Sequence, residues 1–130
     1  MKIPKGILDM IYEQAEDEAP LEACGYLVGK ESVITSHYKM TNVDKSETHF
    51  TFDPKEQFEV AKYVRAEGLK LIAAYHSHPT SPARPSKEDV RLAHDSSIIY
   101  VILSLENGNR TCGAFKIKDG TVTTEPLEII

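Results

Sequence analysis

Two histidines and an aspartate stand at a spacing that suits a metal ion. The segment HSHPTSPARPSKED (76–89) places His76 and His78 one residue apart and carries Ser86 and Asp89 at its far end. Since alternate residues of a strand point to the same face, the two imidazoles can reach one small cation. Two imidazole nitrogens and a carboxylate oxygen are the protein ligands of many catalytic zinc sites. The spacing therefore predicts a metal centre formed by His76, His78 and Asp89.

The same residues also allow a purely structural interpretation. Ser86 and Asp89 have the spacing of a capping box at the start of a helix, and two histidines at a strand end could simply be solvated. The two interpretations are compatible, because a capped helix start is a rigid place from which to present Asp89. Pro79, Pro82 and Pro85 would stiffen the connecting loop, so that less entropy is lost when the ligands converge.

The segments on both sides of this motif are predicted to form a sheet with helices on its faces. Apolar spacing and cap signals predict three helices: between Pro4 and Pro20, from Asp53 to Gly68, and from Ser86 to about His94. Apolar runs bounded by turn signals predict strands at 24–29, 32–40, 49–52, 69–75, 98–105, 111–117 and within 121–130. This order of elements predicts an α/β (α+β) fold.

Length and composition narrow the class of protein. The 130 residues are expected to form a single domain, 1–130, with its own core. A net charge of −5 argues against a nucleic-acid or anionic-membrane partner. No apolar run approaches the roughly 20 residues that span a bilayer, and the first residues lack the features of a signal peptide. Cys24 and Cys112 are too few for a disulfide framework, which favours a reduced, cytoplasmic protein.

These motifs resemble those of the JAMM (MPN-plus) zinc metallopeptidase family. The segment 76–89 fits the metal motif of that family position for position, and LEACGYLVG (21–29) fits its upstream E-x-x-G segment. The likeness extends from the first predicted helix through the strand at 98–105, and it is greatest to compact prokaryotic members. The resemblance implies a curved mixed β-sheet flanked by helices, a fold related to that of cytidine deaminases.

The resemblance also implies a role for each motif residue. His76, His78 and Asp89 become the ligands of one Zn²⁺ per chain. Glu22 becomes the general base, which holds the attacking water and passes its proton to the leaving amine. Ser86 becomes the hydroxyl that steadies the developing oxyanion. The residues alone do not select Glu22, since other carboxylates compete for this role: Glu18, Glu47, Glu56 and Glu88.

The activity implied by this resemblance is hydrolysis of an amide or isopeptide bond. The expected partner is a ubiquitin-like or sulfur-carrier β-grasp protein with a C-terminal Gly-Gly, whose tail is expected to dock near residues 41–52. The released group is either a protein lysine or an amino acid such as cysteine or homocysteine, and no residue of the sequence chooses between them.

Two other functions compete with this one. A metal-binding but non-catalytic MPN-type interaction module has the same fold, although the complete ligand set argues against it. A zinc nucleoside deaminase needs H-x-E and P-C-x-x-C motifs, and the chain has neither. Cys24 and Cys112 have apolar neighbours, so packing is the favoured role for both. Oligomeric state and the role of the tail 125–130 stay open, and three histidines are expected to be structural or solvated: His37, His49 and His94.

Overall fold

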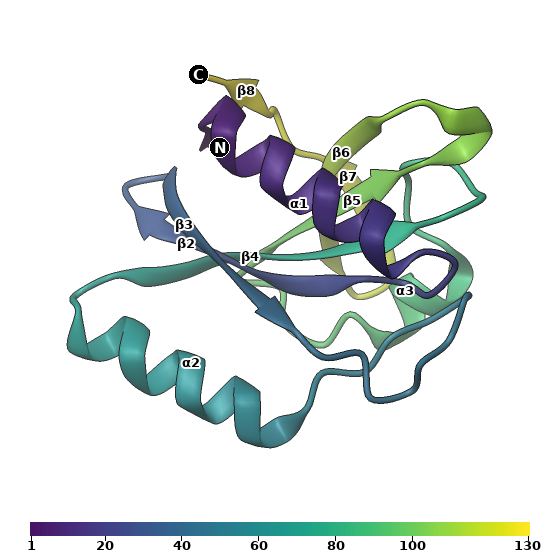
Figure 1. Ribbon diagram of the computed structural model, residues 1–130. Coiled ribbons are helices and arrows are strands. Elements are labelled where there is room, and N and C mark those ends of the chain that lie inside the picture. The colour runs from purple at the N-terminus through teal and green to yellow at the C-terminus, as the bar shows by residue number, and fades with distance from the viewer.

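A computed structural model describes all 130 residues and contains one eight-stranded mixed sheet with helices on both faces (Figure 1). The helices are α1 (Lys5–Glu18), α2 (Pro54–Ala66) and α3 (Lys87–Leu92). The strands are β1 (Lys2–Ile3), β2 (Cys24–Lys30), β3 (Val33–Met40), β4 (Lys70–His78), β5 (Ile99–Ser104), β6 (Thr111–Lys118), β7 (Thr121–Thr124) and β8 (Glu128–Ile129). The mixed sheet confirms the predicted fold class. No helix has the length and apolar character needed to cross a membrane.

The strands follow the order β7-β6-β5-β4-β2-β3-β1-β8 across the sheet. The short strands β7 and β8 lie at opposite edges although only residues 125–127 connect them. Because so few residues span no more than about 14 Å, the sheet must curl until its edges approach each other. The curled sheet wraps around α1 (Figure 1). The tail, whose role the sequence left open, pairs through β8 with β1 and so covers that edge.

Strand alternation divides the core between the two faces of the sheet. On the α1 side, Leu27, Tyr75 and Leu103 pack with the apolar stripe of the helix in a cluster of 14 buried residues. On the α2 side, Tyr26 and Ala74 belong to a smaller cluster. Figure 1 shows α1 and α2 on opposite sides of the sheet. His76 and His78 have the same parity as Ala74 in β4, so both imidazoles lie on the α2 side.

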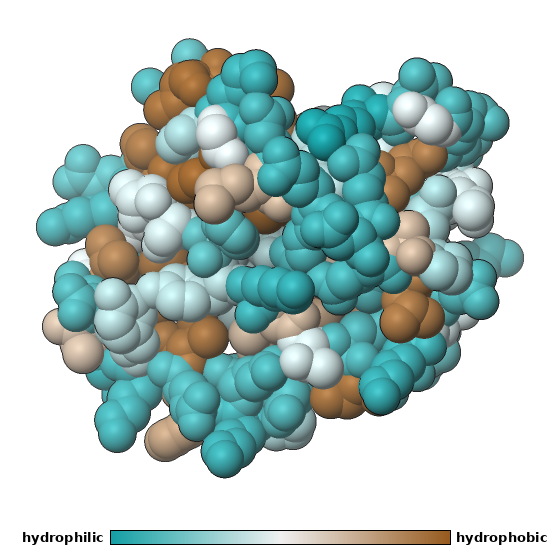
Figure 2. Space-filling view, in the orientation of Figure 1, coloured by the Kyte–Doolittle hydropathy of each residue, from teal (hydrophilic) through white to brown (hydrophobic).

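The outer surface is mostly polar. Figure 2 shows hydrophilic side chains over most of the visible face, with scattered hydrophobic ones. Hydrophobic side chains also gather near the two chain termini, where Ile129 and Ile130 are about half exposed.

One predicted strand is wrong. Residues 49–52 do not form a strand, and only Phe52 makes an isolated bridge, to Asn42. The physical reason is that this backbone bonds within its own loop: Thr51 N–H donates to the Asn42 side chain, and the Thr51 carbonyl accepts from Val43 N–H. The turn between β2 and β3 also lies one residue later than predicted, at Glu31 and Ser32, which both have positive φ.

Candidate metal centre and its cleft

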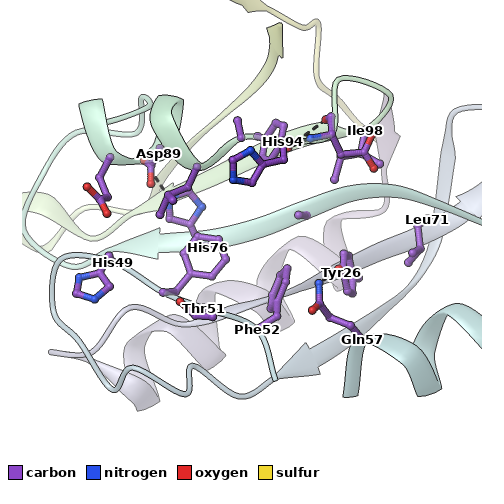
Figure 3. Close-up of a pocket in the computed structure, with 17 residues that line it drawn as sticks. Tyr26, His49, Thr51, Phe52, Gln57, Leu71, His76, Asp89, His94 and Ile98 are labelled. Atoms are coloured by element: carbon purple, nitrogen blue, oxygen red, sulfur yellow. Dashed lines mark hydrogen bonds and ion pairs between the residues drawn. The ribbon is translucent and has the colours of Figure 1, made fainter. Parts of the chain in front are cut away.

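Three side chains converge at the end of β4. His76 and His78 are 2% and 3% exposed, and their Nε2 atoms lie 3.2 Å apart. Asp89 Oδ2 lies 3.1 Å from His76 Nε2 and 3.0 Å from His78 Nε2. Figure 3 shows the Asp89 carboxylate directed at the His76 ring. The structure therefore brings together the three residues that the motif spacing selected as a ligand set.

The start of α3 holds Asp89 in place. Ser86 Oγ accepts a hydrogen bond from Asp89 N–H at 3.0 Å, and Ser86 N–H donates to Asp89 Oδ2 at 2.9 Å. This is the predicted capping box, and its carboxylate oxygen is the same one that faces the two histidines. The capping-box interpretation is thus confirmed, and it is compatible with a metal site, because the same carboxylate faces both imidazoles. Ser86 is exposed, and its hydroxyl hydrogen remains available to a further acceptor.

The proline-rich loop orients one imidazole. His78 Nδ1 lies 2.8 Å from the carbonyl oxygen of Pro82, which can only accept a hydrogen bond. The proton of a neutral His78 therefore belongs on Nδ1, and the Nε2 lone pair points to the cluster. An outer hydrogen bond of this kind is typical of metal-binding histidines.

The electrostatics of the cluster also suit a cation. Burial by itself would raise the pKa of the Asp89 carboxyl, but hydrogen bonds with His76 and His78 outweigh burial and hold that pKa well below its usual range. Burial lowers the pKa of His76, which favours its neutral form. For His78, hydrogen bonds to Asp89 and Pro82 outweigh burial and raise the pKa. The ionised Asp89 and the neutral His76 fit a zinc ion, which requires deprotonated donors, whereas zinc would have to displace the proton that Asp89 favours on His78.

Strand pairing brings Glu22 to the same place. Cys24 in β2 lies opposite His76 in β4, so the residues just before β2 reach the end of β4. A double link fixes this pairing: Ala23 N–H donates to Ser77 Oγ at 2.8 Å, and Ser77 N–H donates to the Ala23 carbonyl at 2.9 Å. The serine between the two histidines therefore aligns the chain that carries Glu22.

The Glu22 carboxylate is buried, and one of its oxygens has no hydrogen-bond partner. The residue is 3% exposed, and its Oε1 has no hydrogen bond. Burial raises the pKa of Glu22 to about 8, with a smaller contribution from the charge of Asp89, while His78 acts in the opposite direction. Buried polar atoms are rarely left unpaired, and perturbed carboxyls of this kind gather at functional sites. Among the competing carboxylates, Glu56 bonds to Thr41 and Glu88 to Arg91. Glu18 also has a buried oxygen without a hydrogen bond, but that oxygen lies 4.0 Å from the Lys39 ammonium group.

A cleft of about 420 Å³ opens beside the cluster. It runs from His76 and Asp89 over the α2 side of the sheet, between residues 49–52 and 92–98 (Figure 3). The Phe50 ring stacks on the His76 ring, with centroids 4.7 Å apart and an interplanar angle of 29°. Apolar residues make up much of the remaining lining: Tyr26, Phe52, Leu71, Ala74, Ile98 and Tyr100. The cleft therefore gives access to His76 and Asp89 from the α2 side of the sheet.

Some residues near the site gave no signal in the sequence. His49 and His94, expected to be structural or solvated, both line the cleft, since the loop and the α3–β5 connection carry them there. Phe50 was assigned to a strand rather than to a wall against His76. The buried Cys24 has a pKa raised by burial to about 12, so its thiol is inert, which agrees with a packing role.

Comparison with known proteins adds independent information. A model for prokaryotic homologues of the JAB domain matches residues 4–117. A CysO-cysteine peptidase of Mycobacterium tuberculosis is 32% identical over 127 residues, which cover 95% of this chain and 87% of the relative. A probable TtuB-protein conjugate cleaving protease of Thermus thermophilus is 36% identical over 105 residues, covering 80% of this chain and 70% of the relative.

Solved structures show the same fold. The solution structure of a protein from Desulfitobacterium hafniense superposes with a TM-score of 0.90 at 36% identity, over 99% of this chain and 92% of the other. The crystal structure of a JAB1/MPN domain protein from Archaeoglobus fulgidus gives a TM-score of 0.68 at 24% identity, over 100% and 99% of the two chains. The curled mixed sheet is therefore a JAB1/MPN fold.

Proposed function

This chain belongs to the family of prokaryotic homologues of the JAB domain, and on that premise we propose that it is a zinc-dependent hydrolase. Its substrate is a ubiquitin-like or sulfur-carrier β-grasp protein, and the bond cleaved is the amide or isopeptide bond after a C-terminal Gly-Gly. The observation that carries this proposal is the convergence of three metal-type ligands beside a cleft, close to a buried Glu22 carboxylate that has one oxygen without a hydrogen bond.

His76, His78 and Asp89 would hold one Zn²⁺ per chain. The three donor atoms already lie about as close as hydrogen-bonded partners, so little ordering is needed when the metal binds. When bound, zinc supplies Lewis-acid chemistry that polarises a carbonyl group and makes water more acidic. Pro82 and Ser86 support the ligands from behind through His78 Nδ1 and Asp89 Oδ2.

Glu22 would transfer the proton during the reaction, and Ser86 would stabilise the oxyanion. Glu22 Oε1 has no competing hydrogen bond, so it can accept a proton from the attacking water. The carboxyl formed in this way can then release the proton to the leaving amine. The Ser86 hydroxyl, which accepts from Asp89 N–H, can donate its hydrogen to the developing oxyanion.

The cleft would receive the C-terminal tail of the substrate. Its wall at 49–52 lies in the segment where the tail is expected to dock, although that wall is a loop rather than a strand. Phe50 on His76 narrows the approach to the cluster, so residues without side chains pass most easily. The names of the two relatives cover both kinds of leaving group, an amino acid in CysO-cysteine and a protein in TtuB-protein conjugates.

The test uses the purified zinc-loaded protein and a β-grasp sulfur carrier with cysteine or a lysine-linked peptide after Gly-Gly. Intact mass should show release of the added group, while a matched Ala-Ala tail should lose most turnover. Equal cleavage of unfolded peptides without Gly-Gly would contradict the proposed specificity. Tight binding of the carrier without cleavage would instead identify a non-catalytic interaction module.

A further inference from the structure

Asn42 is a buried polar residue that touches the backbone of Glu22. Its side-chain amide nitrogen donates to the Glu22 carbonyl and to the His49 carbonyl, each at 3.0 Å. Its amide oxygen accepts from Asp44 N–H at 3.1 Å and from Thr51 N–H at 3.3 Å. Asn42 is 5% exposed, and both donors and both acceptor positions of the amide are in use. The Asn42 side chain thus joins the backbone of Glu22 to both ends of the loop formed by residues 42–52.

The loop holds Glu22 from a second direction as well. Glu22 N–H donates to the Ser46 carbonyl at 2.8 Å. Both backbone polar groups of Glu22 are therefore bonded to residues 42–46, just before the chain is clamped to Ser77 through Ala23. The carboxylate itself, in contrast, has an oxygen with no hydrogen-bond partner. Its position is consequently set by the backbone that carries it.

We propose that Asn42 is a positioning residue, which fixes the Glu22 carboxylate relative to the metal cluster and couples it to the cleft wall at 49–52. This inference rests on the proposed function, in which Glu22 is the base. A displacement of about 1 Å in a reacting group can cost roughly 100-fold in rate. The Glu22 Oε1 atom has no hydrogen bond of its own to keep it in place. If the hydrogen bond from Asn42 to the Glu22 carbonyl is lost, a shift of the Glu22 backbone therefore displaces the carboxylate as well.

The Asn42 side chain also bonds to the residues that form the cleft wall. Asn42 bonds to the backbone of His49 and Thr51, and Phe50 between them stacks on the ring of His76. The base and the wall of the cleft therefore share one anchor. Loss of the Asn42 hydrogen bonds should lower kcat by displacing Glu22. It should also raise KM by making the cleft wall at 49–52 less ordered.

The decisive experiment is a double-mutant cycle. Asn42→Ala and Asn42→Asp are each made in the natural chain and in a Glu22→Gln background, and single-turnover rates are measured with the Gly-Gly substrate. Asn42→Asp keeps the acceptor for Asp44 and Thr51 but cannot donate to the Glu22 carbonyl. In the natural chain we expect either substitution of Asn42 to lower the single-turnover rate about 10- to 100-fold. In the Glu22→Gln background the further loss should be under about threefold, because the group being positioned is already gone.

Two measurements separate positioning from general damage. Zinc content should be unchanged, while hydrogen exchange at the Glu22 amide should speed up in the Asn42 variants. Ile117→Val, in the buried core at β6, serves as a control that lowers stability far from the site and should leave kcat unaltered. Equal losses of kcat in both backgrounds, or no loss in the natural chain, would overturn the role of Asn42. Full activity of Glu22→Gln alone would instead overturn the assignment of the base, on which this inference depends.

Discussion

Replacing Glu22 with glutamine should stabilise the metal-free protein at alkaline pH while it removes the proposed base. Folding buries this carboxyl and raises its pKa from an ordinary value near 4.5 to about 8. Since the folded-state pKa is the higher one, stability linked to this group is fully present below about pH 4.5. That stability is lost as the pH rises through 8. Glutamine carries no charge at any pH, so the Glu22→Gln variant does not lose this stability as the pH rises.

The structure sets the size of this effect. One pKa unit corresponds to about 1.4 kcal/mol, so the shift of Glu22 would be worth about 5 kcal/mol if it were realised in full. Relaxation of the site and entry of water raise the effective dielectric constant, so we expect about 2 to 3 kcal/mol at pH 9. With a urea dependence of about 2 kcal/mol per molar, the unfolding midpoint should rise by about 1 to 1.5 M.

The assay is urea unfolding of chelator-treated protein at pH 4.5 and pH 9. The urea midpoint of Glu22→Gln should be higher than that of the natural chain at pH 9, and the difference between the two midpoints should shrink at pH 4.5. Adding zinc should also reduce it, because a nearby cation favours the carboxylate. Glu59→Gln, on the exposed face of α2, is the matched control and should show no such pH dependence. Equal midpoints for Glu22→Gln and the natural chain at pH 9 would refute the argument from burial.

Three further predictions concern the metal, the oxyanion and the sheet. Asp89→Ala should reduce the zinc content measured by mass spectrometry, and a chelator should abolish turnover of the natural chain; full activity of metal-depleted protein would contradict a zinc mechanism. Ser86→Ala should keep zinc and lose roughly 10²- to 10³-fold in kcat, with about 1 kcal/mol of stability lost with the cap of α3; unchanged kcat would remove Ser86 from the mechanism. Gly25→Ala should lower the unfolding free energy by about 1 to 3 kcal/mol, because an added Cβ would overlap the Tyr75 hydroxyl and the Tyr38 carbonyl. An unaltered urea midpoint would show that β2 can shift without cost.

The convergence of His76, His78 and Asp89 was predictable from the sequence because the interactions that arrange these side chains are local. Alternation along β4 puts His76 and His78 on one face, and a four-residue capping box presents Asp89. Most helices and strands followed from apolar spacing and turn residues in the same way. Residues 49–52 were one exception, since their apolar alternation is overridden by hydrogen bonds to the side chain and backbone of their own loop. The two-residue strand β1 was not predicted, because its partners β3 and β8 are remote in the sequence.

What only the tertiary structure decided lies in contacts between distant segments. The link between Ala23 and Ser77 joins residues 54 positions apart, and the register of β2 against β4 brings Glu22 to the cluster of candidate metal ligands. Family resemblance named Glu22, but its burial and its unpaired oxygen exist only in the folded chain. Asn42 had no signal at all, because a lone asparagine in a polar loop shows nothing of its partners until the loop folds over β2. Local periodicity determines which side chains can share a face, whereas the pairing of remote strands determines which carboxylate lies beside His76, His78 and Asp89.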